Sequence, residues 1–265
     1  MMESDARVAH ASAPVVSVVS APPGTETQAV QWVQVELPDG ASMLAAVARP
    51  LGPGPFPTVV LLHGSHGFAE EYVRLASGLA AGGLLAMAAC WFQGGSGAGA
   101  RFINSIKCPT APPMPDAMSS EARQIVDSLI QAARALPGAH PNGIGIFGHS
   151  RGGGAALNYI LQMGKVQAVA LNSSSYPSLA LDLVPNIKVP ILMLHGTADS
   201  PDDGGAASTD IEMARNFETA SQGAGKEVQA VYYDGGRHNS IFTSATQRDD
   251  EMQTMRAFFL RHLHP

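Results

Sequence analysis

One serine lies where a strand-like segment would turn sharply into a helix. Ser150 stands in Gly-His-Ser-Arg-Gly, flanked two residues away on each side by Gly148 and Gly152. A short apolar segment, 144–147, precedes it, and apolar residues with helical spacing follow it. A serine at such an apex adopts a strained backbone, and glycines relieve the crowding around it. The pattern favours a nucleophile elbow that raises the hydroxyl above a sheet edge over an ordinary glycine-rich loop.

A serine hydroxyl becomes a useful nucleophile only when a neutral imidazole takes its proton. Asp199 and His238 each follow an apolar, strand-like segment. The order serine, aspartate, histidine along the chain is that of the α/β-hydrolase triad. We therefore expect His238 to act as general base and acid and Asp199 to orient it.

Neighbouring aspartates leave the identity of the acid open. Asp202 and Asp203 follow Asp199 in the same turn-like segment, and Asp202 is the main alternative. Asp199 could also be an ordinary turn residue, and His238 an ordinary loop histidine. The elbow and the strand-end positions together favour Ser150, Asp199 and His238.

The negative charge that develops during acyl transfer needs backbone N–H donors. In an elbow the residue after the nucleophile, here Arg151, supplies one of them. The segment His-Gly-Ser-His-Gly, 63–67, follows an early strand, and Ser65 is the expected second donor. Its two histidines, His63 and His66, have no carboxylate or cysteine partner at ligand spacing, so we expect no metal.

Two cofactor motifs compete for a glycine-rich turn between a strand and a helix. A phosphate-binding loop needs a lysine that the segment Gly-His-Ser-Arg-Gly-Gly-Gly lacks. The dinucleotide spacing Gly-x-Gly-x-x-Gly does occur, at Gly143, Gly145 and Gly148, but it lies within the strand-like segment and not between a strand and a helix, where that site needs it. Neither motif therefore supports a phosphate or dinucleotide site at this turn.

Strand-like and helix-like segments alternate along the chain. Strand character marks 31–37, 43–49, 58–64, 84–90, 144–147, 166–172, 190–196 and 227–234, and helical spacing marks 69–82, 119–136, 208–221, the segment after Ser150 and the C-terminal end. This alternation predicts a mostly parallel sheet covered by helices on both faces. The first two segments, joined by Pro-Asp-Gly, predict an antiparallel hairpin at its edge.

Length and composition are consistent with one globular domain. The chain has 265 residues, and we expect a flexible extension over 1–29 and a single domain over 30–265. The net charge of −6 and the lack of any basic run argue against nucleic-acid binding. No apolar segment is long enough to span a membrane. The first residues do not read as a signal peptide, which favours the cytoplasm and leaves a periplasmic or secreted location open.

The segment 91–118 has no sustained period and is crowded with glycine and proline. A loop of this length in a compact domain is usually functional or disordered. Trp91 and Phe92 follow a strand end and could line a substrate pocket, or they could pack under the loop. Cys90 and Cys108 allow one disulfide, and we favour two reduced thiols.

Four motifs carry a family resemblance. His-Gly-Ser-His-Gly, Gly-His-Ser-Arg-Gly-Gly, His-Gly-Thr-Ala-Asp and Gly-Gly-Arg-His, in this order, resemble the α/β-hydrolase superfamily, and within it the serine members of the dienelactone-hydrolase-like group. The resemblance covers about residues 30 to 265. It implies an α/β-hydrolase fold and hydrolysis of esters, lactones or thioesters without a cofactor.

The chain departs from this family pattern in two places. Dienelactone hydrolases typically have cysteine where this chain has Ser150. Larger esterases often insert a cap domain where this chain has only the residues 173–189, so we expect no large cap and an open site.

We expect His66 and His149 to contact the substrate together with Trp91 and Phe92. The favoured function is hydrolysis of a carboxylic ester or lactone of modest size through an acyl-enzyme on Ser150. Alternatives on the same scaffold are a thioesterase and an acyltransferase. A non-catalytic binding protein is less favoured, because such proteins usually lose a triad residue.

Overall fold

The computed structural model describes residues 13–23, 25, 29–37, 39–95, 102–203 and 205–263, except the side chain of Asp203. Its centre is a nine-stranded sheet in the order β1-β2-β3-β5-β4-β6-β7-β8-β9. The strands are β1 (Val15–Val18), β2 (Val30–Glu36), β3 (Ser42–Ala48), β4 (Phe56–Leu62), β5 (Leu85–Ala89), β6 (Ala139–His149), β7 (Ala168–Asn172), β8 (Ile191–Gly196) and β9 (Val228–Tyr233). The α-helices are α1 (Glu70–Ala81), α2 (Ser120–Ala135), α3 (Arg151–Gln162), α4 (Ser178–Leu183), α5 (Ile211–Gly223), α6 (Ser240–Thr243) and α7 (Ala245–His262).

The strand pairing confirms the expected fold class. β4 to β9 pair in parallel, whereas β1, β2 and β3 pair antiparallel and β3 joins the parallel part through β5. Every residue of β5, β7 and β8 is buried, and their sequences are apolar up to the last residues of β7 and β8, as expected of strands covered on both faces. The β2–β3 hairpin that the Pro-Asp-Gly turn predicts is present, and it lies one strand in from the edge because β1 is outermost.

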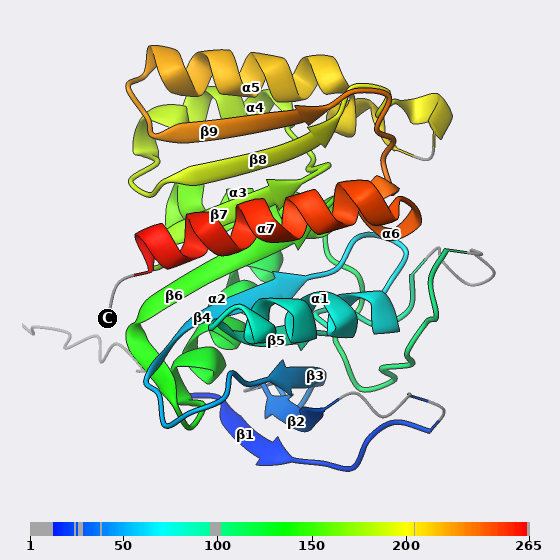
Figure 1. Ribbon diagram of the computed structural model, residues 1–265, viewed down its shortest axis with the longest axis vertical. Coiled ribbons are helices and arrows are strands. Elements are labelled where there is room, and N and C mark those ends of the chain that lie inside the picture. Colours follow the sequence, from blue (N-terminus) through cyan, green and yellow to red (C-terminus); the bar gives the residue numbers. More distant parts are fainter. Residues whose placement is uncertain are drawn as a thin grey trace, which may run out of the picture.

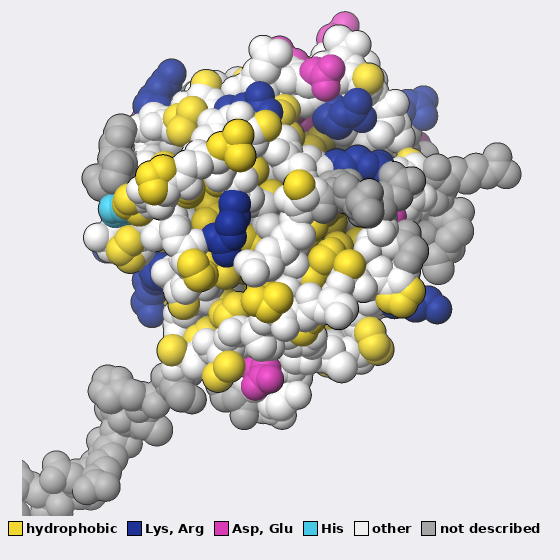
Figure 2. Space-filling view, turned by 60° about the horizontal axis from the view of Figure 1, so that its bottom comes forward, with side chains coloured by type: hydrophobic (Ala, Val, Ile, Leu, Met, Phe, Trp, Pro, Cys, Tyr) yellow, Lys and Arg dark blue, Asp and Glu magenta, His cyan; other side chains and the backbone are white. Residues whose placement is uncertain are grey.

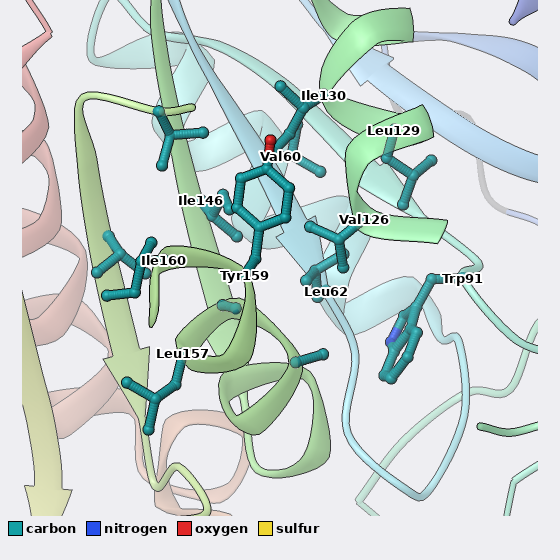
Figure 3. Packing of buried hydrophobic residues seen from close by; sticks show 14 of the residues in the cluster. Val60, Leu62, Trp91, Val126, Leu129, Ile130, Ile146, Leu157, Tyr159 and Ile160 are labelled. Atoms are coloured by element: carbon teal, nitrogen blue, oxygen red, sulfur yellow. The ribbon is translucent and has the colours of Figure 1, made fainter. Parts of the chain in front are cut away.

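Helices cover both faces of the sheet, each over its own hydrophobic core (Figure 1). Helices α1 and α7 pack on one face, and α2, α3, α4 and α5 pack on the other. On the second face, Val60 and Leu62 of β4 and Ile146 of β6 meet Tyr159 of α3 and side chains of α2 (Figure 3). The sheet is thus held rigidly between two apolar layers, and its strand ends provide a fixed platform for a site.

Part of the expected flexible extension is ordered. Val15–Val18 forms β1, which pairs antiparallel with β2, so the expectation of flexibility is wrong for this segment. Residues 1–12 of the extension lie outside the described residues. The strand was missed because its burial is slight and its sequence lacks a clean alternation of apolar and polar residues.

The expectation of two reduced thiols is also wrong. Cys90 and Cys108 form a disulfide with their Cα atoms 6.5 Å apart. Backbone hydrogen bonds return the loop to the body, among them Ile106 N–H to the Phe68 carbonyl oxygen at 2.9 Å. Because the loop folds back in this way, the two cysteines lie close together. Their spacing along the chain does not predict this proximity. Disulfides are typical of oxidising compartments, and the compartment of this protein stays a prediction.

The edge strand of the sheet bears exposed apolar side chains. Val15 and Val18 of β1 are 58% and 69% exposed. Figure 2 turns the lower edge of Figure 1 toward the viewer and shows hydrophobic side chains in groups separated by backbone and other side chains. A strand of only four residues offers little edge for pairing with another chain. Among the described residues, no helix has the length and apolar character needed to cross a membrane.

Candidate active site

Ser150 occupies a sharp turn between β6 and α3. Its backbone has φ 54° and ψ −117°, a left-handed conformation that non-glycine residues seldom adopt. A Cβ atom at Gly148 would collide with the carbonyl oxygen of Gly152, and one at Gly152 with the carbonyl oxygen of Leu62. Both glycines are therefore required by close backbone approach, as the sequence pattern predicts.

Three side chains from different parts of the sheet form one hydrogen-bonded chain. The Ser150 Oγ lies 2.9 Å from His238 Nε2. His238 Nδ1 lies 2.9 Å and 3.0 Å from the two carboxylate oxygens of Asp199. Because a carboxylate only accepts, Nδ1 carries the proton and Nε2 is left to accept from the serine hydroxyl. This arrangement can draw a proton from Ser150 as its oxygen attacks a carbonyl carbon.

Asp199 is fully buried and is held by two histidines. In addition to His238, His195 contacts it: the single N–H at His195 Nε2 is shared between Asp199 Oδ2, at 3.2 Å, and the Thr209 carbonyl oxygen, at 2.9 Å. Burial opposes ionisation of Asp199, but the hydrogen bonds from both rings prevail and lower its pKa to about 2. Asp199 is therefore a carboxylate over the whole neutral range.

Asp202, the main rival for the acid, does not take this place. Asp202 is exposed on the turn Pro201–Asp203, whereas Asp199 contacts His238 directly. The side chain of Asp203 lies outside the described part of the chain. His195 was not predicted to act, although its position at the end of a buried strand, four residues before Asp199, was the available signal.

The loop after β4 is fixed beside the nucleophile. Tyr72 Oη accepts a hydrogen bond from the Gly64 N–H and donates one to His66 Nε2, each at 2.9 Å. Arg151 is the first residue of α3, so its N–H has no acceptor within the helix. The side chain of Arg151 donates from Nε to Ser65 Oγ at 3.0 Å. Ser65 and Arg151 thus lie together beside Ser150, as the oxyanion prediction requires.

Three histidines near the nucleophile are held in the neutral form. Burial lowers the pKa of His63 to about 3. Burial and the neighbouring histidines lower the pKa of His66 to about 2 and that of His149 to about 3. Among the described residues, no group of three or more histidine, cysteine, aspartate or glutamate side chains is arranged to hold a metal ion.

A cavity of about 410 Å³ opens at the serine. Ser65, Ser150 and Arg151 are among the residues that line it. Its walls come from the end of the long loop, the segment around α4, and the residues before α5; they include Asp116, Ala117, Met118, Ser175, Pro177, Leu179, Ala206, Ser208 and Thr209. The long loop and the short segment in place of a cap domain therefore both shape the pocket.

The structure corrects three of the expected substrate contacts. Trp91 and Phe92 are fully buried, and Trp91 Nε1 donates to the His63 carbonyl oxygen at 2.9 Å. Both rings pack in the hydrophobic core instead of lining the pocket, which is the alternative left open above. His149 is also fully buried and faces two asparagines. His66 is partly exposed near Ser150, and its contact with substrate remains a prediction.

Three solved structures share this architecture. A protein assigned as a dienelactone hydrolase from Klebsiella pneumoniae matches with a TM-score of 0.68 and 22% identity, covering 89% of this chain and 100% of that one. An esterase from Pyrococcus furiosus matches with a TM-score of 0.67 and 15% identity over 92% and 100% of the two chains. An acylaminoacyl peptidase from Pyrococcus horikoshii matches with a TM-score of 0.67 and 17% identity. The match covers 88% of this chain and 42% of the peptidase chain. These identities show the fold.

The fold and the comparisons define the class of the protein. A mostly parallel sheet with an antiparallel N-terminal edge, a serine elbow and no large cap make it an α/β-hydrolase of the serine type. The model of the dienelactone hydrolase family matches residues 43–259, and the chain belongs to this family. No curated protein matches the sequence significantly.

Proposed function

We propose that the protein is a carboxylic ester hydrolase that forms an acyl-enzyme on Ser150. The observation that carries this proposal is the hydrogen-bonded chain from Ser150 Oγ through His238 to the buried Asp199, with Ser150 lining an open cavity. Esters and lactones of modest size suit a cavity of about 410 Å³. The family relationship supports hydrolysis, and the ester specificity is our inference.

In the first half-reaction, Ser150 Oγ attacks the carbonyl carbon while His238 Nε2 takes the hydroxyl proton. The N–H groups of Arg151 and Ser65 would stabilise the oxyanion that forms. Collapse of the tetrahedral intermediate breaks the bond to the leaving oxygen, which receives the proton from His238. The acyl group then remains on Ser150 and an alcohol is released, or stays attached when the substrate is a lactone.

In the second half-reaction, a water molecule replaces the alcohol. His238 takes a proton from that water, and the resulting oxygen attacks the acyl carbon. Collapse returns the proton to Ser150 Oγ and releases the acid. Asp199, ionised because its pKa is about 2, stabilises the His238 imidazolium in both halves.

The test is hydrolysis of short- and medium-chain p-nitrophenyl esters, combined with fluorophosphonate labelling and mass spectrometry. We expect labelling at Ser150, and we expect Ser150→Ala to reduce kcat/KM by about 10⁴-fold or more. Ser128→Ala on α2 is the matched control and should retain full activity. Equal activity of Ser150→Ala and the unmodified protein would overturn the mechanism.

Thioesters of the same acyl groups separate the ester proposal from its nearest alternative. Both classes pass through the same acyl-enzyme, so the comparison uses kcat/KM for the first half-reaction. A higher kcat/KM for the oxygen ester supports the proposal. If Ser150 is labelled but thioesters are clearly preferred, Ser150 remains the proposed nucleophile and the proposal that the substrate is a carboxylic ester fails.

A further inference from the structure

A carboxyl group lies buried in the helix that packs behind the active site. Glu251 of α7 has no exposed surface. Its Oε1 accepts from Gln247 Nε2 at 2.7 Å and its Oε2 accepts from Asn172 Nδ2 at 2.9 Å. Among the described residues, no lysine or arginine forms an ion pair with it. A buried carboxyl without a cation is costly, and an apolar residue would pack the helix better.

Asn172 connects this carboxyl to the nucleophile. It ends β7, and its backbone carbonyl oxygen accepts from the Ser150 N–H at 3.0 Å. Its side-chain Oδ1 lies 2.7 Å from His149 Nδ1. One asparagine therefore holds the backbone of the nucleophile and the side chain that precedes it, and Glu251 fixes the amide of that asparagine.

The chain of contacts continues to the catalytic histidine. His149 Nε2 lies 3.3 Å from Oδ1 of Asn239, the residue that follows His238. The rings of His149 and His238 lie 5.3 Å apart between centroids. The buried network thus runs from α7 to both the proposed nucleophile and the proposed base.

We propose that Glu251 is a positioning residue, which holds the Ser150 elbow and the adjoining face of His238 through Asn172 and His149. This inference rests on the proposed role of Ser150. Glu251 does not reach the substrate or the reacting atoms, and it acts by fixing the groups that do.

The network can exist in two protonation states. In the structure both Glu251 oxygens accept, which is the pattern of the ionised carboxylate. A protonated Glu251 needs an acceptor for its O–H, and Oδ1 of Asn172 supplies one when the amide turns over. The amide then donates from Nδ2 to His149 Nδ1, and the proton of the neutral His149 ring moves to Nε2, where Asn239 Oδ1 accepts it.

The surroundings of Glu251 place this change in an accessible pH range. Burial raises its pKa to about 8, against the lowering effect of the two amide hydrogen bonds, and Asp250 on the same helix raises it further. From β9, the Tyr233 phenol faces the same region and donates to Asp250 at 2.9 Å. β7 contributes the Asn172 amide, which carries no charge.

Glu251→Gln tests the role with little change of shape, and Asp249→Asn, an exposed carboxylate of the same helix, is its control. At about pH 9 we expect Glu251→Gln to lower kcat for ester hydrolysis about tenfold with KM unchanged. The ionised carboxylate makes the stronger hydrogen bond to Asn172, and glutamine cannot. Toward about pH 6 the two proteins should converge, because glutamine resembles the protonated acid. Asp249→Asn should match the unmodified protein throughout.

Four outcomes would overturn the inference. A rate ratio that does not change with pH would assign Glu251 a structural role alone, and so would full activity of Glu251→Gln. If fluorophosphonate does not label Ser150 in the unmodified protein, the proposed function fails, and the inference fails with it. If Ser150 is labelled at equal rates in both proteins at every pH, only the inference fails.

Should Glu251→Gln fail to fold, nitrogen NMR of histidine-labelled unmodified protein decides the question. We expect the proton of His149 to move from Nε2 to Nδ1 as Glu251 ionises, with a midpoint at the Glu251 pKa of about 8. A ring that keeps its proton on one nitrogen across this range would overturn the coupling.

Discussion

At the scale of single residues, surroundings decide what a carboxylate can do. Asp199 and Asp202 have the same side chain and lie three positions apart. Asp199 is buried between His195 and His238, which hold its charge, whereas Asp202 is exposed on a turn. A charge fixed in a buried site stabilises an imidazolium far better than one surrounded by water. Of these two, we therefore expect Asp199 to be the one that supports His238.

Replacement of each aspartate by asparagine tests this contrast. Asp199→Asn should lower kcat/KM for a p-nitrophenyl ester by about 10⁴-fold, because asparagine does not hold the required tautomer of His238. Asp202→Asn, the matched control, should stay within about twofold, as surface changes away from a site usually do. A large loss in Asp202→Asn, with Asp199→Asn still active, would reverse the assignment.

At the scale of elements, strand ends and one covalent link position the site. Ser150 follows β6, Asp199 follows β8, and His238 lies between β9 and α6. Parallel strands end at the same sheet edge, which brings these residues together. The disulfide of Cys90 and Cys108 fastens the long loop whose last residues line the pocket.

Loss of this disulfide should destabilise the folded protein. The bond closes a loop with a sequence separation of 18 residues, which corresponds to about 3 kcal/mol of free energy of unfolding in the chain-entropy model. The measurement is urea unfolding of the unmodified protein and of the Cys90→Ala/Cys108→Ala double variant, each with and without reductant. Reductant should lower the midpoint of the unmodified protein and leave the double variant unaffected. The prediction would be contradicted if reductant frees the two thiols of the unmodified protein and its urea midpoint does not change.

At the scale of the whole molecule, a buried acid couples stability to pH. The pKa of Glu251 is about 8 in the fold, well above the 4.5 of a free glutamate. The folded protein therefore binds more protons than the unfolded chain between these values, and its stability falls as pH rises. The contribution of the Glu251 protonation equilibrium to the free energy of unfolding is fully present below about pH 4.5. It is lost as the pH rises through about 8.

Thermal unfolding across this range measures the effect. The stability of the unmodified protein relative to Glu251→Gln should decrease between about pH 5 and about pH 9, because glutamine does not titrate. Asp249→Asn, which changes an exposed carboxylate, should follow the unmodified protein. A constant difference between the unmodified protein and Glu251→Gln would show that Glu251 does not hold a raised pKa.

The sequence alone predicted the features that depend on local pattern. The glycine spacing around Ser150 predicted the elbow, and unbroken apolar segments predicted the parallel strands that the structure contains. Chain order selected Asp199 and His238, because parallel strands carry their ends to one edge. These features are encoded within a few residues, where backbone sterics and side-chain periodicity act directly.

Only the tertiary structure decided which distant side chains meet. It paired Cys90 with Cys108, buried Trp91 under its loop, and linked Glu251 to Asn172 across 79 positions of sequence. Glu251 had a faint signal, since it lies four residues before the buried Met255 on the same helix. A helical period shows that such a side chain faces inward, but its partner and its pKa depend on packing between elements.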